Sequence, residues 1–278
     1  MAQLNRRDFL RLIATSGIVL GAGNALAYTT YDGESALPSK IALPPSLMLH
    51  SRHRWILPDI LDYLLENDYT GIHYADFERA LLGYETLPEK PILITIDDLT
   101  AVQGQNPTIL EYFGAMKDAL VERGIKGSFA HITRPDLAQD DALWDEFRSW
   151  TEQGIAFETH TANHGFLGEA GMTQADYDTE IITSAEFITE KIGLPVRALV
   201  TPYGSGYDMD TDTVTPQVIA SCKQAGLRFI VGIVNGRAPI RVPINTNDVL
   251  YVGRVGPGVN NDVYGAQLEI EFWREEYR

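Results

Sequence analysis

A chain of 278 residues with 45% hydrophobic and 22% charged side chains has the composition of a globular protein, which excludes a disordered or polytopic membrane protein. The length leaves open whether it forms one domain or two. The formal net charge of -16 argues against a nucleic-acid-binding or anionic-lipid-binding surface, because both require clustered lysine and arginine.

The first 27 residues have the pattern of an export signal. The pair Arg6-Arg7 precedes an apolar run at 12–25, and this run ends at a small-residue cleavage site over 25–27. The run is too short to span a bilayer, and the paired arginines resemble the twin-arginine signal of bacterial Tat export. We therefore predict cleavage after Ala27, a periplasmic or extracellular location, and no membrane span in the mature protein.

The rest of the chain predicts a short leader and one domain. Residues 28–40 are polar and turn-rich, which is typical of a flexible leader, and residues 41–278 contain no second linker or repeat. Cys222 is the only cysteine, so no intramolecular disulfide can form. Its place in a helical pattern predicts a small buried side chain.

Within this domain, short apolar runs alternate with amphipathic ones. Leu143, Phe147 and Trp150 recur at helical spacing, which predicts a helix with one buried face. Repeated strand-helix units predict a parallel sheet that is buried on both faces and can close into a barrel, with its active site at the carboxyl ends of the strands. The expected strands are 46–50, 70–74, 91–96, 126–132, 155–161, 196–201, 228–234 and 249–255, and the expected helices are 57–68, 75–83, 108–124, 142–154, 177–193, 216–226 and a terminal segment.

Three of the expected strands end in polar motifs, at 95–98, 160–164 and 201–204. His160 and His164 stand four positions apart, a spacing that lets two imidazoles grip one divalent ion, but no carboxylate lies between them. Asp97 and Asp98 offer the missing acids, one as a metal ligand and the other as a general base. Taken singly, each motif also fits a structural role: a helix cap for the aspartates, a hydrogen-bonded histidine pair, and an ordinary turn at 202–204.

The set TIDD, HTANH and TPYG resembles the polysaccharide deacetylase family, carbohydrate esterase family 4 with its NodB-homology domain, over nearly all of residues 41–270. The resemblance implies an incomplete (β/α) barrel and a divalent metal, most often zinc with cobalt as another candidate, held by Asp98, His160 and His164. Asp97 would be the general base. Pro202, Tyr203 and Gly204 would contact the substrate, and the backbone N–H of Tyr203 would stabilise the oxyanion.

The chain also departs from the family pattern. Leu99 replaces a usual glycine after the two aspartates, Val200 stands near a usual arginine, and no histidine follows His164 to act as the general acid. An early L-M-L-H strand resembles the branch that deacetylates poly-β-1,6-N-acetylglucosamine, in which an early histidine takes that role. We therefore expect His50 to be the acid and Arg254 to replace the missing arginine.

The remaining histidines are weaker candidates. The sequence places His53 in an exposed turn and His73 in a strand, and it leaves a position near the substrate open for His131. We expect an exported, metal-dependent N-deacetylase of an N-acetylglucosamine-containing polysaccharide, with a glycan as partner and no nucleic acid. Two alternatives stay open: an O-acetyl esterase on xylan or a related glycan, and an inactive glycan-binding protein on the same fold.

Overall fold

The computed structural model describes residues 40–208, 211, 213–233, 241–243, 248–257 and 262–276. Residues 38–278 form one compact unit. The predicted export signal at 1–27 lies outside the described residues, as does the predicted leader up to residue 39. Among the helices that are described, none is long and apolar enough to cross a bilayer.

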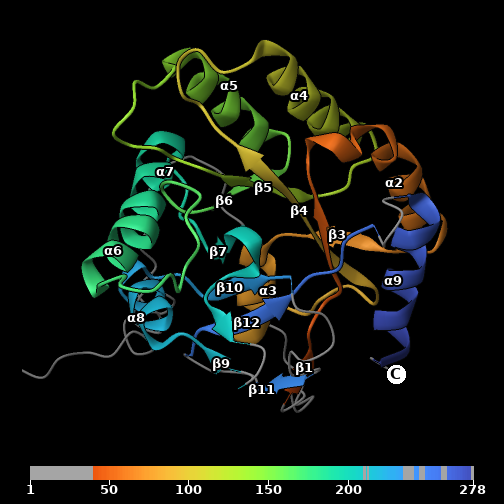
Figure 1. Cartoon of the computed structure of the whole chain (residues 1–278). Helices are drawn as coiled ribbons and strands as arrows, with labels where there is room; N and C mark the ends of the chain where they lie inside the picture. Colours follow the sequence, from red (N-terminus) through yellow and green to blue (C-terminus); the bar gives the residue numbers. More distant parts are fainter. Residues whose placement is uncertain are drawn as a thin grey trace, which may run out of the picture. The chain divides into compact units, whose positions relative to one another are not determined.

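The centre of the fold is a parallel eight-stranded sheet that curls into a nearly closed barrel (Figure 1). The gap between its first and last strands is bridged by two backbone hydrogen bonds, from Met48 N to Val255 O at 2.8 Å and from Val255 N to Ser46 O at 2.9 Å. This arrangement confirms the predicted (β/α) barrel. In spatial order the strands are β12 (Leu250–Gly253), β10 (Phe229–Gly232), β7 (Ala198–Val200), β6 (Ile155–Thr159), β5 (Gly127–His131), β4 (Pro91–Leu99) and β2 (Ser46–Leu49), and β3 (Thr70–Ile72) also pairs with β4.

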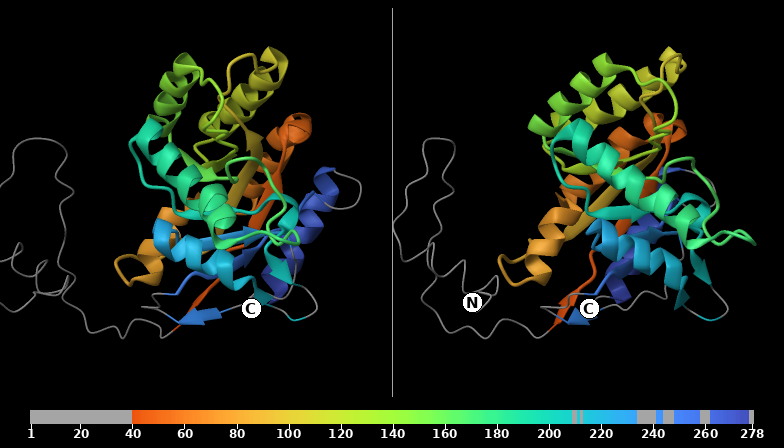
Figure 2. Two further views of the ribbon diagram at one scale, coloured as in Figure 1. Left: turned by 60° about the vertical axis from the view of Figure 1, so that its left-hand side comes forward. Right: turned by 90° about the vertical axis from the view of Figure 1, so that its left-hand side faces the viewer.

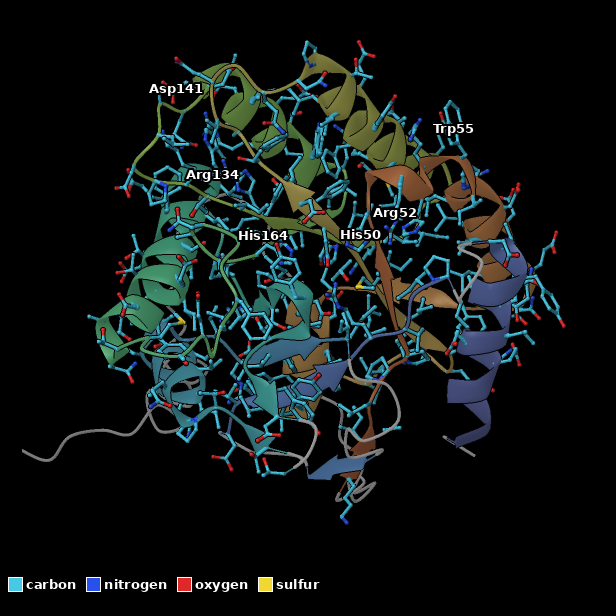
Figure 3. All side chains as sticks on the ribbon, in the orientation of Figure 1. His50, Arg52, Trp55, Arg134, Asp141 and His164 are labelled. Carbon is cyan, nitrogen blue, oxygen red and sulfur yellow. The ribbon has the colours of Figure 1, made fainter. Side chains whose placement is uncertain are left out.

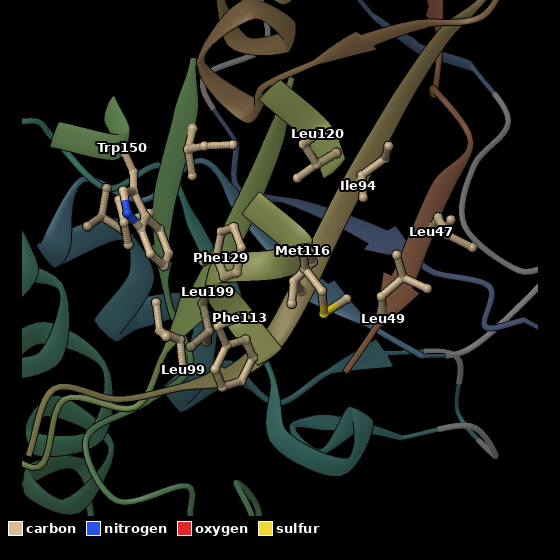
Figure 4. Close-up of a cluster of buried hydrophobic side chains, with 14 of the residues drawn as sticks. Leu47, Leu49, Ile94, Leu99, Phe113, Met116, Leu120, Phe129, Trp150 and Leu199 are labelled. Atoms are coloured by element: carbon tan, nitrogen blue, oxygen red, sulfur yellow. The ribbon is translucent and has the colours of Figure 1, made fainter. Parts of the chain in front are cut away.

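Helices surround the outside of this sheet (Figure 2). They are α2 (Leu57–Glu66), α4 (Pro107–Glu122), α5 (Asp141–Glu152), α6 (Gln174–Asp178), α7 (Ser184–Ile192), α8 (Pro216–Ala225) and α9 (Val263–Glu276), with one π-helical turn, η2 (Thr179–Thr183), between α6 and α7. The expected stripe on α5 is present, since Phe147 and Trp150 are buried and Leu143 is half-buried. Figure 4 shows part of the resulting core, in which Phe129 of β5 packs against Phe113 of α4 and Trp150 of α5.

A second apolar cluster fills the barrel interior. It includes α3 (Tyr74–Leu81), whose Phe77 stacks on Phe229 of β10 with ring centroids 5.2 Å apart. Ala130 and Ala198 also belong to this cluster and leave room for it. The interior is therefore packed side chains and not a channel, as in other small barrels.

Two short antiparallel pairs lie outside the barrel sheet. β1 (Lys40–Ala42) pairs with β11 (Arg241–Pro243), and β8 (Tyr207–Asp208) pairs with β9 (Thr213–Val214).

Three histidines differ from their sequence expectations. His53 is buried in the 3-10 helix η1 (Ser51–Trp55) and is not in an exposed turn. His73 is the residue before α3 and is not in a strand. His131 points away from the substrate side: it is fully buried and stacks on Trp144 of α5 at 4.6 Å, and this burial lowers its pKa to about 3.

Candidate active site

The two aspartates sit in a bulge at the end of β4. The register with β5 shifts between Ile96 and Leu99, and Asp98 has a φ of 73°. Adjacent residues of a regular strand point to opposite faces, but a bulge inserts a residue and re-aims its side chain. Both carboxylates therefore reach the same site, Asp97 in the buried interior and Asp98 at the more exposed rim.

The loop after β6 brings the two histidines to Asp98. The Nε2 atoms of His160 and His164 lie 3.4 and 3.2 Å from Asp98 Oδ1. Ligand atoms of the three residues lie within 4.8 Å of one another. One carboxylate and two imidazoles suit zinc and other first-row divalent ions, and they leave coordination positions open for water and substrate.

The outer nitrogens of both imidazoles are also engaged. His160 Nδ1 lies 2.7 Å from the carbonyl oxygen of Val200, and His164 Nδ1 lies 3.1 Å from the Tyr203 hydroxyl. A proton on Nδ1 satisfies each contact and leaves the Nε2 lone pair for a metal ion, which is the usual arrangement around metal-bound histidine. Burial and the neighbouring His160 lower the pKa of His164, and a lowered pKa favours the neutral ligand form. These three residues therefore fit a divalent ion.

Asp97 is paired with the buried guanidinium of Arg254, just beyond β12. Arg254 Nη1 donates to Asp97 Oδ1 and to Thr95 Oγ1, both at 2.7 Å, and Nε donates to the carbonyl of Gly232 at 3.2 Å. Burial opposes ionisation of Asp97, but the charges of Arg254 and His160 hold its pKa below the usual value. Asp97 is thus a buried carboxylate that stays ionised, as a general base must. Arg254 stands where the sequence led us to expect a substitute for the missing arginine.

His50 lies on the opposite side of Asp98 from the histidine loop. It follows β2 and precedes η1, and its Nε2 is 4.0 Å from Asp98 Oδ2. Its buried Nδ1 has no hydrogen-bond partner within the part of the chain that the structure describes. Burial lowers the pKa of His50, and the carboxylates of Asp97 and Asp98 offset part of that effect. The structure thus places the early histidine beside the aspartates.

The third motif forms a tight turn, η3 (Pro202–Gly204), after β7. Tyr203 has a φ of 58°, and its side chain is 63% exposed beside His164, with ring centroids 4.8 Å apart. A Cβ on Gly204 would come within 2.3 Å of the Ile233 side chain, so only glycine fits there. The turn thus holds Pro202 buried and presents Tyr203 at the rim.

Glu180 is a site residue that sequence patterns did not reveal. It lies in the π-helical turn η2, where its carboxylate accepts hydrogen bonds from Asn163 N at 2.9 Å and Asn163 Nδ2 at 2.8 Å, and its carbonyl accepts from Ala162 N at 3.0 Å. Both contacts fall between His160 and His164. Glu180 therefore fixes the loop that carries the two histidines.

Backbone strain is concentrated at this site. Six described non-glycine residues have a positive φ, and all but Asp68 lie in or beside the site: Asp98, Arg134, Thr161, His164 and Tyr203. A left-handed conformation costs a non-glycine residue about 1–2 kcal/mol. Strain of this kind persists where surrounding contacts impose it, and it is commonest at functional sites.

The sequence pattern of the polysaccharide deacetylase family matches residues 84–230, more than half of the chain, including all three motifs. The chain belongs to this family. A search of curated protein sequences finds no match.

Solved structures share the deacetylase fold at low identity. Streptococcus pyogenes deacetylase PplD, in complex with acetate, aligns with a TM-score of 0.63 and 16% identity over 83% of this chain and 99% of that one. IcaB from Ammonifex degensii gives 0.59 and 17% over 84% and 97%. A de-N-acetylase from Aggregatibacter actinomycetemcomitans gives 0.51 and 17% over 76% and 93%.

The family's usual glycine is not needed where this chain has Leu99. The φ of Leu99 is not positive, so its backbone conformation is compatible with a side chain. That side chain is fully buried in the core that the sheet shares with the surrounding helices. Val200, near the usual arginine, contributes its carbonyl oxygen to His160 and its side chain to the barrel interior. Neither departure from the family pattern disturbs the site.

Proposed function

We propose that this polysaccharide deacetylase removes N-acetyl groups from an N-acetylglucosamine-containing polysaccharide and releases acetate, using a divalent metal ion. Its donor set of one carboxylate and two imidazoles favours zinc. The observation that carries the proposal is the convergence of Asp98, His160 and His164 next to Asp97, a carboxylate kept ionised in a buried position. A divalent ion held there would polarise the acetamido carbonyl and assist ionisation of the attacking water.

Asp97 is positioned to take a proton from the attacking water. As the water oxygen bonds to the carbonyl carbon, its proton passes to Asp97, whose orientation Arg254 and Thr95 maintain through Nη1. Negative charge then develops on the carbonyl oxygen. The backbone N–H of Tyr203, at the tight turn after β7, is the proposed donor to that oxygen, and Pro202 and Gly204 shape the turn.

His50 is the proposed donor to the leaving nitrogen. The C–N bond breaks as the protonated imidazole gives its proton to the amine, and the products are acetate and the free amino sugar. A histidine whose pKa is lowered is a stronger acid once protonated, which suits expulsion of an amine. In the described part of the chain, His53 is buried with both ring nitrogens in hydrogen bonds to His50 N and Arg52 Nε, His73 is bonded to the carbonyl of Gly154, and His131 is buried against Trp144.

Four considerations favour an amide substrate and an exported enzyme. The early-histidine arrangement resembles the branch that acts on poly-β-1,6-N-acetylglucosamine, and a solved protein of the same fold is named a de-N-acetylase. An acid at His50 matters most for an amine leaving group, since alcohols of O-acetyl esters leave with less protonation. The signal pattern at 1–27 supports Tat export to the periplasm or beyond.

The test is acetate release by the metal-loaded protein from β-1,6- and β-1,4-linked N-acetylglucosamine oligomers. Asp97→Asn and His50→Ala should each lower the rate by about 10² or more, as expected for loss of a general base or acid. Asp62→Asn is the matched control, because Asp62 is a surface carboxylate paired with Arg123 and should leave the rate unchanged.

The outcomes separate the alternatives. Release that is lost in both variants supports the assignment, and the faster oligomer identifies the linkage. Activity on acetate esters that survives His50→Ala, with no release from amides, would show an O-acetyl esterase. No turnover and no retained metal in equilibrium dialysis would contradict the enzymatic proposal.

A further inference from the structure

Most lysines and arginines whose side chains the structure describes have a carboxylate partner. Among lysines and arginines whose side chains the structure describes, eleven lie within 4.0 Å of an aspartate or glutamate: Arg79, Lys90, Lys117, Arg123, Lys126, Arg148, Lys191, Arg197, Lys223, Arg228 and Arg254. Within the same described part, the four without such a partner are Lys40, Arg52, Arg54 and Arg134. With a net charge of -16 for the chain, cations that lack a carboxylate are the exception.

Two of these exceptions flank the candidate active site. Figure 3 shows Arg52 on the side of His50 and Arg134 on the side of His164, with the two histidines between them. Both arginines are exposed. Arg52 lies two residues after His50, and Arg134 is hydrogen-bonded through its backbone N–H to the loop that carries His160 and His164.

The backbone beneath Arg134 is fixed to the histidine loop. Arg134 N donates to the carbonyl of Ala162 at 2.8 Å, and the preceding Thr133 N donates to the carbonyl of Thr161 at 3.3 Å. Arg134 also has a φ of 41°, which lies in the left-handed region that favours glycine. The fold therefore holds the backbone of Arg134 beside the histidine loop at some energetic cost.

Arg52 is fixed on the other side. It lies in η1, two residues after His50, and its Nε donates to His53 Nε2 at 3.2 Å. Among the described residues, none offers a carboxylate within 4.0 Å of its guanidinium. Arg54 differs, because its guanidinium packs over the rings of Tyr112 at 3.5 Å and Trp55 at 4.4 Å and so has a packing role.

The carboxylates of the site are not paired with these two arginines. Asp97 is paired with Arg254, and Asp98 faces the two imidazoles of the histidine loop. Arg52 and Arg134 therefore place positive charge beside the site that can attract anionic groups, although the chain as a whole has a net charge of -16. Guanidinium groups bind carboxylates and phosphates through paired hydrogen bonds, and such complementarity sets specificity.

We propose that the substrate is an anionic glycan, with carboxylate or phosphate groups on the sugars that flank the N-acetylated unit, bound by Arg52 on one side and Arg134 on the other. This inference rests on the proposed deacetylation and narrows its substrate class. A neutral homopolymer would leave both guanidinium groups without a counter-charge.

Binding tests the inference separately from turnover. Metal-loaded Asp97→Asn protein is titrated with four oligomers of equal length: a neutral N-acetylglucosamine oligomer, one alternating with a uronic acid, one alternating with a sugar that bears a lactyl carboxylate, and one bearing phosphate. At low salt, at least one anionic oligomer should bind about tenfold tighter than the neutral one, and 0.5 M salt should reduce the difference. The preferred oligomer identifies the source of the charge.

Substitution of the arginines then assigns the preference. Adding Arg52→Gln and Arg134→Gln together should make the affinities for the anionic and neutral oligomers equal. Lys40→Gln, which removes the carboxylate-free cation on β1, should leave the difference in affinity unchanged. Thermal melts confirm that the variants fold. The same ratio is measured for kcat/KM of acetate release with Asp97 intact.

Each result decides one of the two proposals. Equal binding of neutral and anionic oligomers, or a preference that survives the double substitution, overturns the anionic-substrate inference and leaves deacetylation standing if acetate is released. A preference that depends on the two arginines, without acetate release from any oligomer, supports the charged ligand and counts against the proposed reaction.

Discussion

Asp97 and Arg254 form a fully buried ion pair in which a single guanidinium nitrogen serves both a carboxylate and the Thr95 hydroxyl. Removing one member of such a pair leaves the other charge without compensation in a low-dielectric interior. Arg254 therefore has two roles that can be separated, since it stabilises the fold and it also keeps Asp97 ionised and oriented.

We predict that Arg254→Met lowers the free energy of unfolding by about 3–5 kcal/mol and the rate of acetate release by 10² or more. Adding Asp97→Asn should restore much of the stability, because the orphaned charge disappears, but none of the activity. Urea unfolding and acetate assays of both single variants and the double variant measure this coupling. If the stability losses of the two single variants simply add, the pair is not the stabilising unit.

Glu158 of β6 is a buried carboxyl group with a structural role. Its Oε2 accepts hydrogen bonds from the backbone N–H groups of Arg197 and Ala198 at 2.8 and 2.7 Å, where the described β6–β7 ladder has only one registered pair. Burial is the largest influence and raises its pKa to about 8 despite those donors. Glu158 thus joins two barrel strands while it carries a proton at neutral pH.

Stability should therefore depend on pH through Glu158. Its folded-state pKa of about 8 exceeds the ordinary value of 4.5, so the folded protein holds this proton more tightly than the unfolded chain does. The resulting stabilisation is complete below pH 4.5 and is lost as the pH rises to about 8, by at most about 5 kcal/mol. In Glu158→Gln, whose amide oxygen can accept the same hydrogen bonds, this dependence should vanish. The measurement is urea unfolding of both proteins from pH 5 to 9, and parallel pH profiles would contradict the prediction.

At the scale of elements, the site depends on two irregularities: the bulge that ends β4 and the π-helical turn η2 between α6 and α7. Sequence reading located the motifs at strand ends, because alternation of apolar and amphipathic runs shows where strands stop. It did not reveal the π turn, since residues 177–193 read as one continuous helix. Glu180 lies within this turn and contacts Ala162 and Asn163 from it.

We predict that Glu180→Ala weakens metal binding by about 10–100-fold, the usual cost of losing a residue that orients ligands. Glu180 is not one of the three candidate ligands, and its carboxylate would act by fixing the loop between His160 and His164. Competition with a chromophoric chelator measures the dissociation constant for zinc. Glu186→Ala is the control, since Glu186 lies on neighbouring α7 and has no described contact with the loop. Equal affinities in the two variants would show that the histidine loop holds its shape without Glu180.

The sequence predicted only in part which strand side chains face the barrel interior and which face the outer helices. The apolar pattern predicted a buried β5 but could not decide where His131 points, because a strand buried on both faces has no polar side to orient it. The partner of Asp97 was also hard to predict. Arg254 is far from Asp97 in the sequence, and only closure of the barrel brings the end of β12 beside β4. The residue type made Arg254 a candidate, and the structure shows its contact with Asp97.

At the scale of the whole molecule, few hydrogen bonds close the barrel, and the candidate metal site lies at the carboxyl ends of its strands. Two backbone hydrogen bonds link β2 to Val255, whereas β2 and β4, and β5 and β6, pair over longer registers. Asp98 comes from β4, while His160 and His164 follow β6, so their ligand atoms bridge the strand β5 that lies between. An ion at this point would tie together segments that separate on unfolding.

We therefore predict that a divalent ion stabilises the fold through these three residues. A ligand that binds only the folded state adds about 2.7 kcal/mol when its concentration is 100 times its Kd, which corresponds to a rise in Tm of about 5–10 °C for a domain of this size. Chelation with EDTA should reverse the rise. Asp98→Asn should abolish it, because a neutral amide replaces the anionic ligand, while Asp62→Asn should retain it. Calorimetry with and without zinc distinguishes these cases. A rise of equal size in Asp98→Asn would place the stabilising ion elsewhere and remove the physical basis for assigning the metal to this site.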